Sequence, residues 1–343
     1  MKPTSVANPK EKIEELGRRI ERVHRSVLEP DVVRGLLPIK SKLLPHLMRA
    51  SEARTREERF RAASPSYVQA LADDDAYTQN TRVMTLDGLR WWVPILRPDQ
   101  EADVRRCMGQ QDFPYRVITQ TREAAIGGIM LDIGANNGRM AVPRAILGDV
   151  RAVYCAEPDP LNYACLVRNV RDNHLAGLVL PDQVAIVSLT GTVRLERAKH
   201  VGGHTVIDRS SRSRRETVDV PGYRLDDWIE RLGIASEDIS FVKVDVQGSE
   251  ASVLSGAPRL LEWKHIAWQM EIDPRLLAKR GATTTNLFEM LRRHFTHFVD
   301  VNRRLTGPRA RPTAEMADAL AYILEPTVGR TDVLLFSIVG GTA

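Results

Sequence analysis

The chain has 343 residues, and its hydrophobic content of 43% lets one large domain or two smaller ones bury a sizeable core. It has no run of about 18 apolar residues and no apolar N-terminal signal region, so we expect a cytoplasmic protein without a membrane span. The net charge of +5 is compatible with an acidic or phosphorylated substrate and is too small to indicate nucleic-acid binding.

The first part of the chain is predicted to be helical. Residues Pro9–Leu28 carry apolar side chains at three- and four-residue spacing, which predicts an amphipathic helix of two heptads ending before Pro30. So short a helix is unstable alone, so its apolar face must pack on its own chain or form part of a homodimer together with the domain body. An Arg/Glu-rich helix is expected around Glu52–Ala63.

The segment Thr81–Pro94 predicts a β-hairpin, because alternating residues flank Asp87 and Gly88, a pair suited to a tight turn. Trp91 and Trp92 are adjacent and therefore point to opposite faces of their strand. One of them is expected in the core, and the other can stack on a sugar ring.

Strands alternate with helical segments beyond about residue 115, which predicts an α/β domain with a mostly parallel sheet covered on both sides. We therefore divide the chain into an N-terminal extension and cap, residues 1–114, whose last helix is Gln100–Met108, and a domain of residues 115–343. Glycines and short β-like runs between the third and fourth strands predict an inserted hairpin or loop. The strands are expected at about residues 129–133, 152–157, 183–187, 240–245, 267–272, 296–301 and 332–338.

The segment Met130–Gly138, MLDIGANNG, combines a buried strand, an acidic residue, a glycine-rich turn and the start of a helix. This arrangement brings backbone N–H groups close to a nucleotide-like ligand. The spacing is G-x-x-x-G, so the pyrophosphate-binding G-x-G-x-x-G is absent. Asp132 is expected to face a hydrogen-bond-donating or positive ligand group, such as the amino acid end of S-adenosylmethionine; an ordinary strand–helix turn is the alternative.

The second strand ends in Glu157, nineteen residues after Gly138, followed by Pro158. An acidic residue at this spacing suits a bidentate contact to ribose hydroxyls, and a solvated strand end is the alternative. The third strand contains Val184 and Ala185, and the end of this strand commonly flanks an adenine in such folds.

Six motifs carry a family resemblance: LDIGANNG, AEPDP, LVRNVRDN, YRLDDWI, FVKVDVQGSEASVLSGAPRLL and AWQMEI. Over roughly residues 115–300 the chain resembles the FkbM-type S-adenosylmethionine-dependent methyltransferases, which usually have Glu in place of Gln247. The resemblance implies a class I methyltransferase fold, a Rossmann-like seven-stranded sheet with one antiparallel strand. It also implies S-adenosylmethionine as cofactor and methyl transfer to a hydroxyl of a sugar, glycoside or other natural product. The cofactor-binding residues expected from the motifs are Asp132, Gly134, Asn136, Asn137, Gly138, Glu157, Pro158, Val184, Ala185 and Asp245.

Three residues are candidate catalytic groups for methyl transfer, which needs in-line alignment and can need removal of the acceptor proton. Asp245 ends the fourth strand, where it can contact the cofactor or the acceptor hydroxyl, or cap the next turn. Lys243 needs a partner for its charge, either Asp245 or Glu271, and can orient the acceptor oxygen or act as a base. His204, in the inserted segment, has a suitable pKa for proton removal, although a lone histidine is more often a surface residue.

The remaining polar clusters give weaker signals. Arg209, Arg212, Arg214 and Arg215 form either a solvated loop or a contact to a phosphate group. No His, Asp or Glu cluster has metal-ligand spacing, so no metal is expected. The three cysteines, Cys107, Cys155 and Cys165, also lack it and are expected to be reduced core thiols.

Alternatives from other functional classes stay open. An NAD-dependent oxidoreductase needs the same turn and Glu157, but should carry the missing G-x-G-x-x-G. A catalytically inactive methyltransferase-like binding protein is suggested by Gln247 and by the N-terminal extension. A nucleic-acid or protein methyltransferase should carry an N-P-P-Y-like motif after the fourth strand, where this chain has VDVQGSE.

Overall fold

The computed structural model describes residues 51–73, 80–95, 113–198, 203–207, 213–301 and 309–338. The helices predicted at Pro9–Leu28 and Gln100–Met108 lie outside these residues, as do Cys107, Arg209 and Arg212. The homodimer contact proposed for the first helix and the domain boundary near residue 115 therefore stay predictions.

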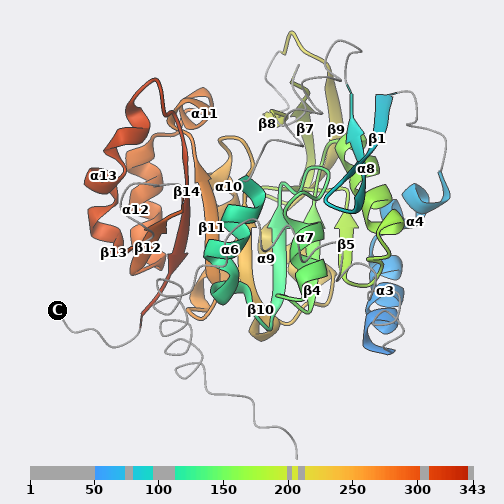
Figure 1. The fold of residues 1–343 in the computed structure, drawn as a ribbon. Helices are drawn as coiled ribbons and strands as arrows, with labels where there is room; N and C mark the ends of the chain where they lie inside the picture. Colours follow the sequence, from blue (N-terminus) through green and yellow to red (C-terminus); the bar gives the residue numbers. More distant parts are fainter. Residues whose placement is uncertain are drawn as a thin grey trace, which may run out of the picture.

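A mixed eight-stranded sheet forms the centre of the described fold, in the order β13-β12-β14-β11-β10-β3-β4-β5 (Figure 1). Strands β10, β11, β3, β4 and β5 are parallel, whereas β14 pairs antiparallel with both β11 and β12. The parallel strands are buried on both faces, which explains their near-continuous apolar sequences. The strands are β3 Ile129–Ile133, β4 Ala152–Ala156, β5 Val179–Asp182, β10 Ile239–Val244, β11 Ala267–Ile272, β12 His297–Asp300, β13 Ala310–Pro312 and β14 Thr331–Phe336.

Two parts of the predicted sheet are wrong. The sheet has an eighth strand, β13, which pairs antiparallel with β12 and is therefore a second antiparallel strand. The third strand was expected at residues 183–187, but β5 occupies Val179–Asp182, and Ala185–Ile186 forms β6 in a separate sheet. Pro181 and Asp182 indicate a turn by residue type, yet β5 is an edge strand that tolerates proline, and Asp182 is buried with hydrogen-bond partners.

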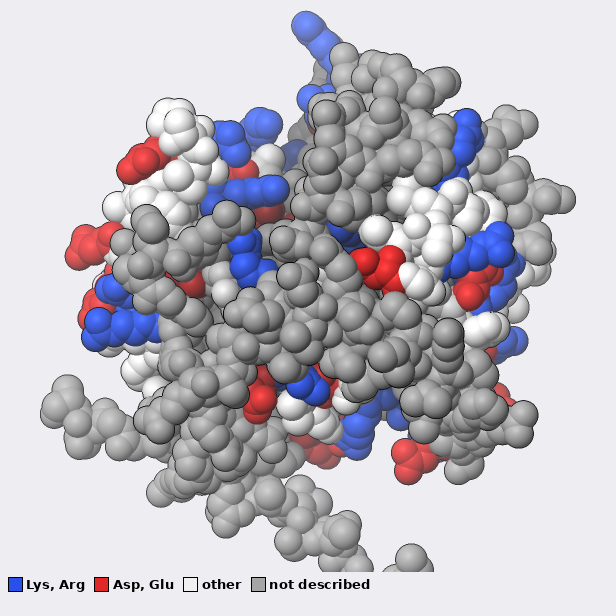
Figure 2. Space-filling model, in the orientation of Figure 1, with Lys and Arg blue, Asp and Glu red and all other residues white. Residues whose placement is uncertain are grey.

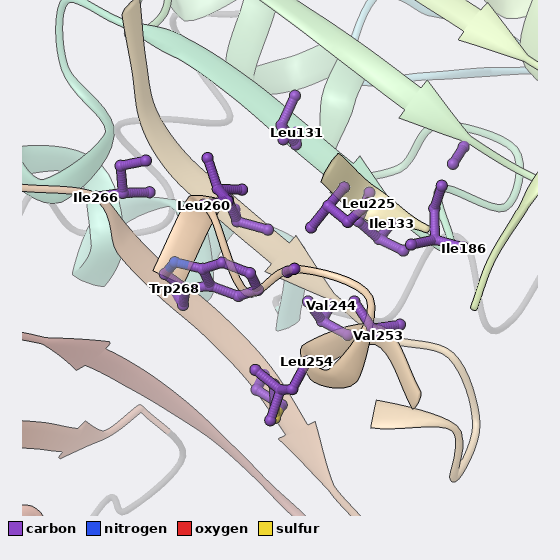
Figure 3. Close-up of a cluster of buried hydrophobic side chains, with 14 of the residues drawn as sticks. Leu131, Ile133, Ile186, Leu225, Val244, Val253, Leu254, Leu260, Ile266 and Trp268 are labelled. Carbon is purple, nitrogen blue, oxygen red and sulfur yellow. The ribbon is translucent and has the colours of Figure 1, made fainter. Parts of the chain in front are cut away.

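Helices cover both faces of the sheet and bury two large apolar clusters. One cluster contains Leu131, Ile133, Val244 and Trp268 beneath α9, α10 and α12 (Figure 3). The other packs α6, α7 and the hairpin against the opposite face. The helices are α3 Ser51–Ala63, α4 Pro65–Ala72, α6 Phe113–Ala125, α7 Ala141–Leu147, α8 Pro160–Asp172, α9 Leu225–Arg231, α10 Glu250–Ser255, α11 Pro274–Lys279, α12 Thr284–His294 and α13 Met316–Ala319.

The inserted segment forms a second sheet of four strands, ordered β6-β9-β7-β8. Strand β7, Gly191–Glu196, pairs antiparallel with β8, Thr205–Ile207, and with β9, Thr217–Tyr223. The chain leaves the main sheet at the carboxyl end of β5 and returns through α9, so the second sheet lies beside the edge where β3, β4 and β5 end (Figure 1).

The described N-terminal elements pack on the body of the domain. Helices α3 and α4 contribute Phe60 and Tyr67 to the larger cluster, and β1, Thr81–Leu86, pairs antiparallel with β2, Leu89–Pro94. Trp91 is buried, whereas the indole Nε1 of Trp92 donates to Asp172 on α8 at 2.8 Å. Trp92 is therefore used in packing the hairpin against α8.

No helix in the described ranges has both the length and the apolar character needed to cross a membrane. Cys155 and Cys165 are buried and free. The described surface in Figure 2 carries basic and acidic side chains in a mixture rather than one broad region of a single sign.

Candidate active site

The carboxyl ends of β3 and β10 meet at the point where the strand order reverses, which is where open α/β sheets bind ligands. Asp245 donates its backbone N–H to the carbonyl of Ile133 at 3.0 Å. Gly134 has φ +79, and a Cβ at this position would lie 1.9 Å from the carbonyl oxygen of Asp245. The glycine is therefore required by both its backbone conformation and the close approach of the two loops.

The loop of residues 134–138 satisfies its own backbone donors. Gly134 and Ala135 donate to the carbonyl of Ala156, and Gly138 donates to that of Ala135. The N–H of Asn136 donates to Glu157 Oε2 at 2.8 Å, and that of Asn137 to the side chain of Asn136. All five N–H groups are used within the protein, so this stretch offers no free donors to a pyrophosphate.

Glu157 is buried at the end of β4 and connects two loops. Its Oε2 accepts from Asn136, and its Oε1 accepts from the N–H of Asp159 at 2.9 Å. Burial, followed by repulsion from Asp159, raises the pKa of Glu157 to about 8. The residue lies where the sequence predicted an acidic group, directly beside the glycine-rich loop.

The other predicted cofactor residues lie in three places. Asn137 and Gly138 face α8 and the hairpin: Asn137 Nδ2 donates to the carbonyl of Trp92 at 3.3 Å, and a Cβ on Gly138 would lie 2.6 Å from Leu166. Pro158 is half-buried after β4. Val184 and Ala185 are buried beyond β5, in the cores of the main and second sheets respectively.

Lys243 and Asp132 form a buried ion pair across the switch point. They are direct partners in the parallel register of β10 and β3, with Lys243 Nζ 3.0 Å from Asp132 Oδ1. Burial disfavours the charge on Lys243, but Asp132 and Asp245 outweigh it and raise its pKa above the ordinary value. Burial raises the pKa of Asp132, and Lys243 opposes this effect. The first partner of Lys243 is therefore Asp132 rather than Asp245 or Glu271, the two that the sequence suggested.

Further groups extend this pair along the edge of the sheet. Lys243 Nζ lies 3.7 Å from Asp245 Oδ2, and Gln247 Nε2 donates to Asp245 Oδ1 at 2.9 Å and to Glu271 Oε2 at 3.2 Å. Arg330 Nη1 lies 3.0 Å from Glu271 Oε1. We call these six residues the polar row: Asp132, Lys243, Asp245, Gln247, Glu271 and Arg330.

Asp245 is the acidic member of the polar row that reaches solvent. Its side chain is 32% exposed, against 0% for Asp132 and 7% for Glu271. One oxygen is held by Gln247 and the other faces Lys243. Asp245 can therefore present a fixed carboxylate to a ligand at the end of β10.

His204 lies apart from the polar row, in the second sheet beside the start of α8. Its Nδ1 accepts from the backbone N–H of Ala198 at 3.0 Å, and its Nε2 lies 3.8 Å from Asp159 Oδ2. Burial lowers the pKa of His204. The lone pair on Nδ1 is occupied, so the neutral tautomer carries its proton on Nε2 and points it toward Asp159.

Two buried polar networks are not evident from the sequence. Asp182 accepts hydrogen bonds from Ser64, Trp228 and Arg231. Arg144 is fully buried, donates to Thr121 and pairs with Asp149. Each network has one sign in the sequence, a single charged residue within an otherwise apolar stretch: VLPDQVAIV for Asp182 and AVPRAIL for Arg144. A buried charge requires a partner, but the local sequence does not show which distant residue supplies it.

Described members of the basic cluster lie on the second sheet, where Arg215 Nη1 is 3.1 Å from Glu196 Oε1 and Arg214 is exposed. Within the described residues, no group of three or more His, Cys, Asp and Glu is arranged to hold a metal ion.

Comparison with known proteins places this site within a characterised domain type. Residues 132–300 match the methyltransferase FkbM domain, a range that includes the last two residues of β3, the second sheet and the polar row except Arg330. A 2-O-methyltransferase NoeI from Sinorhizobium fredii (strain NBRC 101917 / NGR234) is 28% identical over 147 residues. This alignment covers 39% of the present chain and 58% of the relative.

Two solved structures are similar to the chain. Methyltransferase FkbM from Methylobacillus flagellatus KT has 16% identity and a TM-score of 0.33, with 69% of this chain and 61% of that chain covered. The M. jannaschii tRNA m1G37 methyltransferase has 9% identity and a TM-score of 0.33, with 76% and 58% covered. These TM-scores are too low to support a family assignment, so we base the comparison on the domain match alone. The match over residues 132–300 confirms the resemblance to the FkbM-type methyltransferases that the sequence motifs indicate.

Proposed function

We propose that the protein is an S-adenosylmethionine-dependent O-methyltransferase that acts on a hydroxyl of a sugar, a glycoside or another natural product. The observation that carries the proposal is the position of Asp245. Its partly exposed carboxylate stands at the carboxyl end of β10 between Lys243 and Gln247, and its backbone carbonyl lies against Gly134 of the glycine-rich loop. This is the crevice in which an acceptor hydroxyl and a cofactor can meet.

The glycine-rich loop favours S-adenosylmethionine over NAD. A dinucleotide needs backbone donors for its pyrophosphate, and the donors of residues 134–138 are all occupied. S-Adenosylmethionine has no phosphate and carries positive sulfonium and ammonium groups that suit an acidic edge. Asp132 Oδ2 is buried and has no hydrogen-bond partner among the described residues, which supports a role toward a donor group of the cofactor.

The residues expected to hold the cofactor are those at the ends of β3, β4 and β5. Glu157 uses each of its oxygens once for a backbone N–H, and a carboxylate can accept further hydrogen bonds, so it retains capacity for ribose hydroxyls. When bound, S-adenosylmethionine supplies an electrophilic methyl group on a sulfonium. The acceptor oxygen forms its bond to the methyl carbon as the carbon–sulfur bond breaks and its electron pair stays on sulfur.

The polar row provides two functions for this reaction. Asp245 orients the acceptor hydroxyl and takes up its proton as the new bond forms, which leaves a neutral ether and a protonated carboxyl that solvent then deprotonates. Lys243 remains charged in its pair with Asp132 and fixes one side of Asp245. His204 has its accessible lone pair occupied by Ala198, so we assign the proton to Asp245 rather than to His204.

Calorimetric titration of the full chain with S-adenosylmethionine, and with NAD as the comparison, tests the cofactor. We expect S-adenosylmethionine to bind, and Glu157→Ala to weaken the binding by about 1–3 kcal/mol because two hydrogen bonds to the Glu157 carboxyl group are lost. Binding of NAD without S-adenosylmethionine would identify an oxidoreductase instead.

Methyl transfer is then tested with isotope-labelled S-adenosylmethionine and a panel of glycosides, each followed by its mass shift. A labelled methyl ether on one of them supports the proposal. Cofactor binding without turnover on any acceptor would favour a methyltransferase-like binding protein.

A further inference from the structure

Gln247 connects the carboxyl ends of two neighbouring strands. Its amide nitrogen carries two hydrogens and donates one to Asp245, after β10, and one to Glu271 on β11. The residue has φ +56, in the left-handed region that side chains other than glycine rarely adopt. The turn continues with Gly248, so a residue with a strained backbone is kept where its side chain reaches both carboxylates.

The surroundings of Gln247 are strongly acidic. Glu271 is buried, and burial followed by repulsion from Asp245 raises its pKa well above the ordinary value, although Arg330 opposes this. In this chain the neutral amide of Gln247 satisfies two acceptors without adding charge to them. The charged groups that act on Glu271 are Asp245, Arg330, Asp332 and Glu250. Asp245 in turn faces Lys243, which is paired with Asp132.

We propose that Gln247 is a positioning residue that fixes the rotamer of Asp245 toward the acceptor without adding a negative charge beside it. The inference rests on the proposed methyl transfer, in which Asp245 receives the hydroxyl proton. Gln247 does not touch the reacting atoms. It acts through Oδ1 of Asp245, while Lys243 faces Oδ2 of the same carboxylate. A carboxylate that is held on both sides loses less conformational freedom when the acceptor binds.

The decisive variant is Gln247→Glu, which places a third carboxyl group within hydrogen-bond reach of Asp245 and Glu271. The three groups must then titrate together, and at least one retains a proton near neutrality. We expect the acidic limb of the kcat–pH profile to move upward by about one pH unit or more. The double variant Gln247→Glu with Glu271→Gln removes one charge and should return the limb close to its original position.

Gln247→Ala separates positioning from charge. It removes both hydrogen bonds without adding a carboxylate, so kcat should fall by about tenfold across the pH range while the cofactor KM changes less than about threefold. Gln69→Glu is the matched control, because it makes the same substitution at an exposed position on α4 and should leave the profile unmoved.

The same variants are compared by urea unfolding between pH 5 and 9, a measurement that needs neither cofactor nor acceptor. Gln247→Glu should lose stability relative to the parent protein as the pH rises, because three neighbouring carboxyls must ionise, and the double variant should lose less. An unchanged pH dependence of both unfolding and kcat in folded Gln247→Glu would overturn the inference. Failure of the proposed function appears separately, as a parent protein that does not bind S-adenosylmethionine.

Discussion

Lys243 and Asp132 face each other in register across β10 and β3, with Nζ 3.0 Å from Oδ1, at the one place where the strand order of the sheet reverses. The pair places the positive charge of Lys243 beside the carboxylate of Asp245, while the Lys243 side chain stays buried. It thereby connects β3, where we propose that the cofactor binds, to β10, which ends at the proposed acceptor-binding residue Asp245.

Removing Lys243 should destabilise the protein strongly. Lys243→Met leaves Asp132 buried without its counter-charge, so we expect the free energy of unfolding to fall by about 3–5 kcal/mol. Adding Asp132→Asn should recover part of the loss, since no buried charge then remains. Urea unfolding at pH 7 measures both, with Lys279→Met, at an exposed position on α11, as the control. Equal effects of Lys243→Met and Lys279→Met would contradict the pairing.

Glu157 should make stability depend on pH. Its pKa is about 8 in the folded protein against 4.5 for an ordinary glutamate, so the folded state holds a proton that the unfolded state releases. The stability contributed by this group is complete below about pH 4.5 and is lost as the pH rises toward 8. Glu250, with a pKa of about 7, adds a slope of the same sign.

Glu157→Gln removes the titration of Glu157 and leaves that of Glu250. Between pH 5 and 8 the free energy of unfolding of the parent protein should therefore fall by about 2–4 kcal/mol more than that of Glu157→Gln. Glu289→Gln, on the exposed face of α12, should retain the slope of the parent. Parallel curves for the parent and Glu157→Gln would mean that Glu157 is ionised throughout this range.

The substitution His204→Gln tests whether His204 has a structural role or acts as the general base. Loss of a general base costs about 10²–10⁴ in kcat, and we expect this loss for Asp245→Asn. For His204→Gln we expect less than about tenfold, because Nδ1 already accepts from Ala198 and Nε2–H points to Asp159. Initial rates of methyl transfer on a common acceptor compare the two variants, and the reverse order would restore His204 as the base.

Gly134→Ala should disrupt the crevice itself. The new Cβ would lie 1.9 Å from the carbonyl oxygen of Asp245, and no side-chain rotation relieves a contact with backbone. We expect a loss of about 3 kcal/mol or more, measured by thermal unfolding. Gly233→Ala is the matched control: it has φ +64 with nothing within 4 Å of its Cβ, so it isolates the backbone penalty of about 1 kcal/mol. Similar losses in both variants would show that the loops can separate.

The sequence predicted the central strands well because each is a continuous apolar run that ends at an acidic residue or a glycine. Strands β3, β4, β10 and β11 all lie within a residue of their expected bounds. β13 could not be found in this way, since Ala310–Pro312 has no apolar pattern and exists through its pairing with β12. Strand β5 was displaced because Pro181 and Asp182 look like a turn until their distant partners are known.

The same limit applies to the site. Asp245, Lys243 and Glu157 could be singled out as candidates because their positions follow from strand ends, which local sequence determines. That Lys243 pairs first with Asp132 depends on the register of two strands whose paired residues are 111 positions apart in the chain. That Nδ1 of His204 accepts a hydrogen bond from the backbone N–H of Ala198 depends on the conformation of the second sheet. Both are properties of tertiary contacts rather than of residue type.

The three donors on Asp182 have a consequence for protein engineering. Ser64 comes from the N-terminal elements and Trp228 and Arg231 from α9, so one carboxylate at the end of β5 is shared by segments that a domain swap would exchange separately. Arg231 also donates to the carbonyl of Ala63. A chimera that imports the N-terminal elements of a relative must therefore import compatible residues at 182, 228 and 231 as well, or it will leave a buried carboxylate with unmatched donors.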